Sequence, residues 1–320
     1  MIQVEHLIKR YGDLVAVNDV SFSLSEGDIV GFLGPNGAGK TTTMRIITGC
    51  LAADSGKVNV GGYDILESPN EAKRFIGYLP EQPPLYDEMT VSAYLDYVAD
   101  LKDIPRQKKK SLKDMAIHEC GLEKVQGRLI KHLSKGYRQR VGIAQAIIND
   151  PKILILDEPT IGLDPRQVKE IRELIKGLTG RRTVIISTHI IYEVTMICQK
   201  VIIINEGRIV AMDSLDSLTS NTGRGRIVLR INTQDEYIKD DLMKIPGVLG
   251  VQKRGPLFFI EHESVRAEMV CEEICKLVLR NGYTILELRP ERISLEDIFV
   301  KIVTKDRGYD KSLDNSLEGA

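Results

Sequence analysis

The stretch that decides the fold is Ile29-Val30-Gly31-Phe32-Leu33-Gly34-Pro35-Asn36-Gly37-Ala38-Gly39-Lys40-Thr41. Its apolar first part, 29–33, predicts a buried strand, and the rest has the spacing GxxxxGK(S/T) followed by a helical pattern. Glycine allows positive φ and a close approach of the backbone, so amides of the loop and of the helix N-terminus can converge on phosphate oxygens. The sequence therefore predicts a phosphate-binding loop between a strand and a helix.

Single residues of this loop have separate expected roles in binding ATP and Mg²⁺. Lys40 is expected to reach the β- and γ-phosphates, and the hydroxyl of Thr41 to bind Mg²⁺. Thr42 lies one step further into the helix and is expected to contact the α-phosphate. The remaining nucleotide-binding residues predicted in the loop are Asn36, Gly37, Ala38 and Gly39.

A second apolar run, 153–156, ends in the carboxylates Asp157 and Glu158. Carboxylates at the end of a buried strand hold Mg²⁺ and the attacking water in phosphate-hydrolysing sites. We therefore expect Asp157 to bind the metal. Glu158 is expected to act as the general base that polarises water, a role that needs a carboxylate close to the γ-phosphate.

The order of the patterns predicts an α/β fold. Short β-branched runs at 29–33, 153–156 and 183–187 are each followed by a helical pattern. This alternation indicates a phosphate-loop domain with a mainly parallel sheet. Between 90 and 120 the pattern is almost wholly helical, which predicts a helical insertion at about 88–150. Its apolar face is expected to carry Tyr94, Leu95, Val98 and Leu101.

Composition excludes several classes of protein. A chain of 320 residues has room for two domains, and a net charge of −1 with 28% charged residues gives no sign of a nucleic-acid partner. The five cysteines are scattered without CxxC spacing, which argues against a disulfide framework or a zinc site. The N-terminus lacks a signal-peptide pattern, and the longest apolar stretch, 183–205, is broken by polar residues, so no membrane span is expected.

The C-terminal third predicts a second, smaller domain. Residues 214–225 are rich in Ser, Thr, Asn and Gly, which favours a linker, and the boundary is placed between domains 1–219 and 220–304. The second domain has the order βαββαβ, typical of a ferredoxin-like α+β fold. An amphipathic helix at 294–303 is expected to pack back on the first domain, and the polar tail 305–320 to be disordered.

Several phosphate-loop families share these features, and Leu133-Ser134-Lys135-Gly136-Tyr137-Arg138-Gln139 discriminates among them. This heptapeptide leads into a helix ahead of Asp157 and resembles the signature motif of the ABC ATPases. The resemblance covers about 1–213. It implies that Ser134 and Gly136 of one subunit close over ATP held by another, so that a second copy or a similar subunit is required. Lys135 and Tyr137 depart from the commonest signature. Lys135 is expected either to add charge near the facing ATP or to point to solvent.

Other motifs of the ABC ATPases match single residues, and each alone has an ordinary structural explanation. By resemblance, Tyr11 stacks on adenine and Gln82 senses both Mg²⁺ and the attacking water. Asp164 matches the D-loop aspartate, and His189 matches the switch histidine that contacts the γ-phosphate. Their joint order decides the assignment. It makes Glu158, His189 and Gln82 the expected catalytic residues and Thr41, Gln82 and Asp157 the expected metal ligands.

The signature variant, the stretch 157–165 and the stretch 294–299 resemble ATPases of ABC-2 type exporters, of the multidrug and gliding-motility groups. Such ATPases power separate integral-membrane permease subunits, which here are expected to dock at about 82–97, and they lie at the cytoplasmic face of the membrane. The alternative is a soluble ABC ATPase that remodels nucleic acid or ribosomes. Its usual tandem cassettes, coiled coil or basic stripe are not seen in the sequence.

Overall fold

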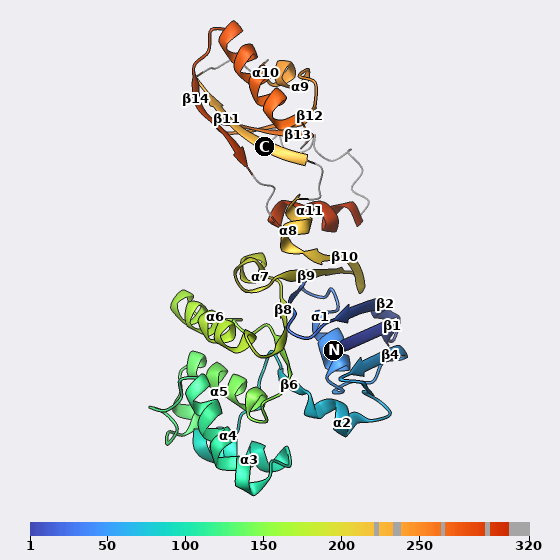
Figure 1. Ribbon diagram of the computed structural model, residues 1–320, viewed down its shortest axis with the longest axis vertical. Coiled ribbons are helices and arrows are strands. Elements are labelled where there is room, and N and C mark those ends of the chain that lie inside the picture. The colour runs from blue at the N-terminus through green and yellow to red at the C-terminus, as the bar shows by residue number, and fades with distance from the viewer. Residues whose placement is uncertain (221–223, 233–237, 264–265, 292–294, 307–320) are drawn as a thin grey trace. The chain divides into compact units, whose positions relative to one another are not determined.

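The computed structural model describes residues 1–220, 224–232, 238–263, 266–291 and 295–306 (Figure 1). Backbone contacts divide the chain into two compact units, Met1–Asp213 and Ser214–Ala320. The predicted boundary after residue 219 falls inside helix α8, Leu215–Ser220, so the stretch expected to be a linker contains a helix. Serine is common both in linkers and at the start of helices. Here the Ser214 hydroxyl accepts a hydrogen bond from the Ser217 amide at 3.0 Å at the start of α8.

A six-stranded sheet forms the centre of the first unit, in the order β10-β9-β3-β8-β7-β6. Its strands are β3 (Ile29–Leu33), β6 (Ile76–Leu79), β7 (Ile153–Asp157), β8 (Thr183–Thr188), β9 (Lys200–Asn205) and β10 (Arg208–Ser214). The neighbours from β9 through β6 all pair in parallel. β7 and β8 are buried along their whole length, as expected for parallel strands covered on both faces. The mainly parallel sheet predicted from the alternating pattern is confirmed.

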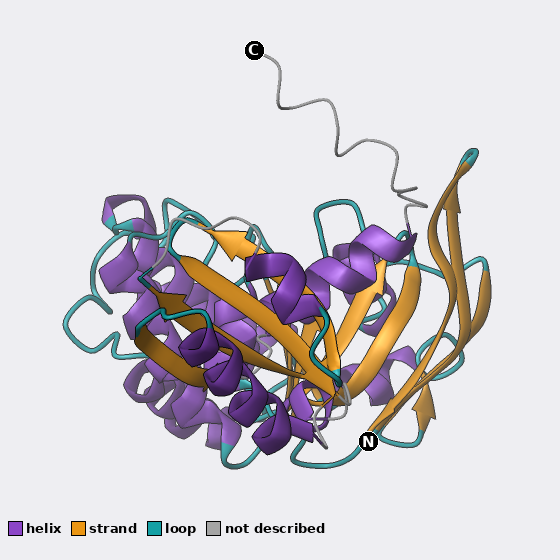
Figure 2. Ribbon diagram, turned by 90° about the horizontal axis from the view of Figure 1, so that it is seen from above, coloured by secondary structure: helices purple, strands orange, loops and turns teal. Residues whose placement is uncertain are grey.

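A second, antiparallel sheet in the same unit has the order β2-β1-β4-β5. Its strands are β1 (Ile2–Tyr11), β2 (Leu14–Leu24), β4 (Ser55–Val60) and β5 (Tyr63–Asp64). Figure 2 shows β1 and β2 as a long twisted ribbon that rises from the N-terminus to its turn. Apolar side chains of both sheets and of α1 (Lys40–Ile47) share one core, among them Phe22, Phe32 and Met44. The two elements that flank the phosphate loop, β3 and α1, therefore both contribute to this core.

The predicted helical insertion is present and lies together at one end of the unit (Figure 1). It comprises α3 (Val91–Leu101), α4 (Arg106–Glu119), the short 3₁₀ helix Ile130–His132 and α5 (Lys135–Ile147). Tyr94, Leu95 and Val98 are buried as expected. Leu101, expected on the same face, is 65% exposed, because it is the last residue of α3 and lines a pocket. The other helices of the unit are α2 (Pro69–Arg74), α6 (Pro165–Thr179) and α7 (Ile191–Ile197).

The second unit has the predicted order of elements and its own core. They are β11 (Arg224–Ile231), α9 (Ile238–Met243), β12 (Val248–Arg254), β13 (Leu257–Glu263), α10 (Ala267–Arg280) and β14 (Ile285–Glu291). The strands pair antiparallel in the order β12-β13-β11-β14, which is the ferredoxin-like arrangement. Apolar residues of α9 and α10 pack on the sheet in a core that shares no residue with the first unit.

The last helix, α11, spans Leu295–Asp306. It ends later than predicted, so residues 305 and 306 are helical and not part of a disordered tail. The rest of that tail, 307–320, lies outside the described residues. Asp297 accepts a hydrogen bond from Arg226 Nη1 at 2.8 Å, which ties α11 to β11 within the second unit. Among the described helices, none combines the length and the apolar character that crossing a bilayer requires.

Candidate functional site

The phosphate loop runs from the end of β3 to the start of α1 and depends on two glycines. Gly37 and Gly39 have φ of 81° and 101°, in the left-handed region that favours glycine. A side chain on Gly39 would also collide with the carbonyl oxygen of Ala16. Asn36 is exposed at the tip and Ala38 is buried, with its amide bonded to the Pro35 carbonyl at 3.2 Å. The loop backbone therefore has the positive φ angles that the glycine spacing predicts.

Lys40 lies under this loop and is only 6% exposed. Its Nζ donates to the carbonyl oxygens of Gly34 and Pro35 at 2.9 and 3.2 Å. It also lies 3.4 Å from Glu158 Oε1. The ammonium group thus joins the loop to the end of β7. Thr41 and Thr42 follow in the first turn of α1, both partly buried.

Asp157 ends β7 and is completely buried. Neither of its carboxylate oxygens has a hydrogen bond of ordinary geometry among the described residues. Burial raises the pKa of this carboxyl, and the hydroxyls of Ser187 and Thr41 only partly offset that effect. An orphaned buried carboxylate beside a threonine hydroxyl suits a divalent cation, since Mg²⁺ is commonly held by one or two carboxylates together with substrate phosphates. These residues therefore fit the predicted metal site.

Glu158 directly follows and turns back toward the end of β8. It is 5% exposed, and its φ of 48° is a conformation that a non-glycine residue adopts only when its surroundings enforce it. Its amide donates to the Ser187 carbonyl at 2.8 Å. Nδ1 of His189 lies 3.0 Å from each carboxylate oxygen. The structure thus brings the predicted general base and the predicted switch histidine into direct contact.

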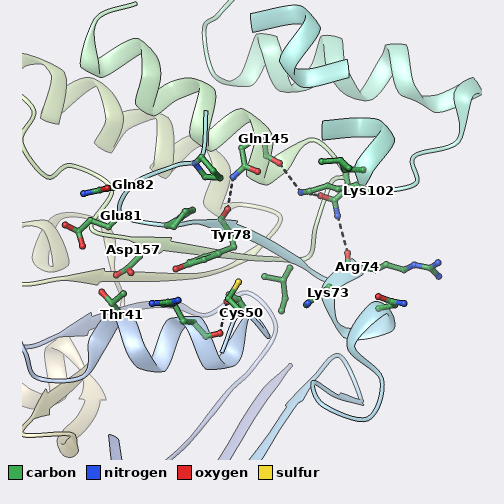
Figure 3. Close-up of a pocket in the computed structure, with 18 of the residues that line it drawn as sticks. Thr41, Cys50, Lys73, Arg74, Tyr78, Glu81, Gln82, Lys102, Gln145 and Asp157 are labelled. Carbon is green, nitrogen blue, oxygen red and sulfur yellow. Dashed lines mark hydrogen bonds between the residues drawn. The ribbon is translucent and has the colours of Figure 1, made fainter. Parts of the chain in front are cut away.

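Gln82 reaches the same region from the loop after β6. It lines a pocket of about 920 Å³ together with Thr41 and Asp157. Figure 3 shows Thr41, Glu81, Gln82 and Asp157 gathered at one end of this pocket. Tyr11 is not part of it. That ring lies at the end of β1, 47% exposed, with Lys9 Nζ 5.9 Å from its centroid.

The opposite end of this pocket is basic. Figure 3 shows Lys73, Arg74 and Lys102 there, and we call these three residues the basic end of the pocket. Lys102 is partly buried and donates to the carbonyl oxygens of Gln145 and Ala146 and to Oδ1 of Asn149, at 3.0, 3.3 and 2.7 Å. Burial lowers the pKa of Lys102 to about 8.

The signature and D-loop residues lie elsewhere. Ser134 Oγ accepts from the Tyr137 amide at 3.4 Å and caps α5, and Asp164 Oδ1 accepts from the Gln167 amide at 2.9 Å and caps α6. Ser134, Gly136 and Asp164 line a second pocket of about 440 Å³. None of the described residues that line it belongs to the phosphate loop. The Lys135 ammonium lies against Gly162 of the D-loop.

Proteins of similar sequence identify the family of this chain. The family model described as ABC transporter matches residues 17–161. The bacitracin transport ATP-binding protein BcrA of Bacillus licheniformis is 34% identical over 308 residues, covering 95% of this chain and 97% of the relative. The chain belongs to the ABC transporter family. It is an ATP-binding subunit of that family and an ATPase.

Two further relatives of this ABC ATPase bear on its fold and use. The linearmycin resistance ATP-binding protein LnrL of Bacillus subtilis (strain 168) is 31% identical over 305 residues, 94% of this chain and 98% of the relative. The solved dimeric structure of MJ0796, a bacterial ABC transporter cassette, superposes with a TM-score of 0.61 at 26% identity. It covers 67% of this chain and 99% of that chain. The predicted ABC ATPase fold is confirmed.

Gln139 and Glu193 are among the buried polar residues near the site that received no functional role from the sequence. Gln139, inside the signature heptapeptide, donates from Nε2 to the Pro159 carbonyl at 2.8 Å and so connects α5 to the loop after Glu158. Glu193 interrupts the apolar stretch 183–205 and is 2% exposed. In the sequence, Glu193 stands out only as an acidic residue within an apolar stretch. That pattern does not indicate which groups form hydrogen bonds with its carboxylate.

Proposed function

We propose that this ABC ATPase is the motor subunit of an ABC-2 type exporter. Two relatives that span nearly the whole chain support the proposal, because their names specify bacitracin transport and linearmycin resistance. Their similarity extends over both units of this chain, including the second unit. Substrate choice then lies in a separate permease, and this chain supplies the energy of ATP binding and hydrolysis.

The site residues divide the chemistry among themselves. Thr41 and Asp157 would hold Mg²⁺, with Gln82 facing them across the pocket, and the ion would neutralise charge on the phosphates. Lys40 and the amides of the phosphate loop bind the β- and γ-phosphates. Glu158 accepts a proton from the attacking water, and His189 orients that carboxylate and contacts the γ-phosphate. Tyr11 presents an exposed ring for adenine to stack on.

Two copies of the chain are needed for a complete site. The observation that carries this step is the separation of the two pockets: Ser134, Gly136 and Asp164 line one, and the phosphate loop contributes nothing to it. We infer that these three residues close over ATP bound to a second copy, or to a similar subunit. Closure on ATP and opening after hydrolysis shift the populations of the two states and drive the permease.

The permease partner is expected at about 82–97, and Gln82 and Pro84 of this segment line the pocket of about 920 Å³. The same pocket joins the metal end of the site to the basic end formed by Lys73, Arg74 and Lys102, and we extend the docking site to that end. A cytoplasmic permease segment with an acidic residue would complement this charge. Such docking places the ATPase peripherally, at the cytoplasmic face of the cell membrane. Gln82 lies in the same pocket and can report the state of the nucleotide site to the partner.

Replacing the general base tests the ATP-driven dimer. Glu158→Gln should lower kcat at least roughly 100-fold, the usual contribution of a general base, and leave ATP binding intact. With Mg²⁺ and ATP it should elute as a dimer in size-exclusion chromatography, because the closed state no longer turns over. Glu88→Gln, which changes an exposed carboxylate paired with Lys131, is the control and should behave as wild type. A variant that stays monomeric at saturating ATP would contradict the proposal.

Charge reversal at the basic end tests the permease site. Lys73→Glu with Arg74→Glu should abolish stimulation of the ATPase by membranes that contain the co-expressed permease, and leave the basal ATPase rate unchanged. Lys169→Glu, an exposed lysine on α6 outside this pocket, is the matched control. Stimulation by RNA or ribosomes, with none by the permease, would favour a soluble remodelling ATPase instead.

A further inference from the structure

Glu193 on α7 is a buried carboxylate, 2% exposed, with no basic group within ion-pair distance among the described residues. Two hydroxyls satisfy it instead. Thr160 Oγ1 donates to Oε1, and Thr188 Oγ1 donates to Oε2 at 2.9 Å. A buried charge is costly unless it is fully hydrogen-bonded, so the position of both threonines relative to this carboxylate is tightly specified.

The two threonines flank the residues that carry the proposed hydrolytic chemistry, Thr160 in the loop after β7 and Thr188 at the end of β8. Thr160 lies two residues after Glu158, and Thr188 directly precedes His189. The ladder between β7 and β8 ends at the pair Asp157 and Ser187. Beyond that pair, one backbone hydrogen bond from the Glu158 amide to the Ser187 carbonyl and several side-chain contacts hold the two segments together.

The contacts form a closed ring. On one side Glu158 and His189 meet at 3.0 Å, and on the other Glu193 joins Thr160 to Thr188. The hydroxyl of Thr188 has a single proton, which it gives to Glu193, and its oxygen accepts from the Ile190 amide at 3.1 Å. This double engagement fixes the backbone on both sides of His189.

We infer that Glu193 is a positioning residue for ATP hydrolysis: by clamping Thr160 and Thr188 it holds the Glu158 carboxylate against the His189 imidazole. The inference rests on the proposed roles of Glu158 and His189. Glu193 lies behind the two segments and acts only through them, so it should influence the chemical step and not the binding of ATP. Preorganisation of this kind matters because small displacements of a catalytic group cost rate steeply.

The test compares Glu193→Leu with Glu193→Gln. Leucine is close in size and removes both hydrogen bonds, and we expect kcat to fall at least tenfold while the Kd for ATP changes less than about threefold. Glutamine can accept from one threonine and donate to the other, and we expect it to restore most of kcat. Equal loss in both variants, or a loss of ATP affinity instead of kcat, would overturn the inference.

Thr188→Val provides a second route that leaves the buried charge in place, and Thr183→Val is its matched control. Thr183 lies on the same strand and is equally buried, but its hydroxyl binds the Gly27 amide and the Ser25 carbonyl, away from the site. Both variants should lower Tm, and only Thr188→Val should lower kcat. If Glu193→Leu fails to fold, this pair alone decides, and equal kcat in the two would overturn the inference.

A double-mutant cycle separates this inference from the proposed function. If Glu193 acts through Glu158, then adding Glu193→Leu to Glu158→Gln should not reduce the residual rate further. A multiplicative further loss would overturn the positioning role. Wild-type hydrolysis by Glu158→Gln alone would instead refute the general-base assignment, whatever Glu193 does.

Discussion

At the scale of single residues, the site contains a buried carboxylate, Asp157, whose charge the fold alone does not stabilise. Asp157 is fully buried and has no hydrogen bond of ordinary geometry in the described part of the chain. Burial therefore raises the pKa of this carboxyl above its ordinary value. The Asp157 carboxylate thus lowers the stability of the nucleotide-free protein and at the same time suits a cation, so stability is given up for function.

Asp157→Asn should accordingly raise the Tm of the nucleotide-free protein at neutral pH and lower ATP hydrolysis. Because the pKa of Asp157 is raised in the folded state, the wild type loses stability as pH rises from about 3.8 through the folded pKa, while asparagine does not titrate. The gain in Tm should therefore shrink as the pH is lowered toward 4. Thermal unfolding from pH 4 to 8, without nucleotide, measures it.

Asp28→Asn is a control with the opposite sign. Burial acts to raise the pKa of Asp28, but hydrogen bonds from Lys200 and from the Ser25 amide together hold it below its ordinary value. Its contribution to stability is present above pH 3.8 and is lost as pH falls through the lower folded pKa. Asp28→Asn should therefore lower Tm at neutral pH. If Asp157→Asn also lowered Tm, this would contradict the claim that the buried Asp157 carboxylate destabilises the nucleotide-free protein.

At the scale of elements, α5 connects most parts of the first unit. Ser134 caps its start, Gln139 reaches the loop after Glu158, and Gln145 Nε2 donates to the Tyr78 carbonyl at 2.8 Å on β6. Lys102, from the end of α3, binds its last carbonyls, where a cation is favoured by the helix dipole. One helix thus spans the distance from the signature to the basic end of the pocket.

The cap at the end of α5 predicts an unusual alkaline pH dependence. The pKa of Lys102 is lowered to about 8, so between pH 8 and 10.5 the unfolded chain binds the proton more strongly than the folded one. Stability of the wild type relative to Lys102→Met should rise by up to roughly 3 kcal/mol across this window, since one pKa unit corresponds to about 1.4 kcal/mol. Urea unfolding at pH 7 and at pH 10.5 measures the change.

Lys131→Met, which removes an exposed lysine paired with Glu88, controls for effects of alkaline pH itself. Its difference from the wild type should change little over the same range, because an exposed pair contributes little to stability. A difference between wild type and Lys102→Met that is constant with pH would show that the Lys102 ammonium is not buried in solution.

At the scale of the whole molecule, the pocket that contains Thr41 and Asp157 and the pocket lined by the signature residues have no lining residue in common among the described residues. Complementation between two inactive variants tests whether these two pockets meet across a dimer interface. Lys40→Ala damages the phosphate loop and Ser134→Arg blocks the signature pocket, so neither should hydrolyse ATP alone. An equimolar mixture should recover roughly a quarter of the wild-type rate, because random pairing gives half of the dimers one intact site of two.

The control mixes Lys40→Ala chains with chains that carry both substitutions, a pair that can rebuild no intact site. Recovery in the first mixture and not in the second supports a site shared between subunits. A first mixture no more active than its separate components would contradict the trans arrangement.

The sequence by itself determined the phosphate loop, the strand that ends in Asp157 and Glu158, and the ferredoxin-like order of the second unit. Each is encoded in contiguous residues, where an apolar run, a glycine spacing and a helical pattern follow one another. The same local patterns did not reveal that Leu101 is exposed, and they missed the helix at 215–220. Exposure at a helix end and the capping of a helix by a serine depend on neighbours that periodicity does not describe.

Only the tertiary structure decided which distant groups meet. The contact from Glu193 to Thr160 joins residues 33 positions apart and exists because β7 and β8 pair in parallel and end at the same edge. The same pairing brings His189 to Glu158. The family resemblance implied that His189 contacts the γ-phosphate, but it did not imply this contact with Glu158. The separation of the signature pocket from the phosphate loop is likewise a property of the packed helices. Side-chain contacts across elements depend on how those elements pack, and a linear pattern does not contain that geometry.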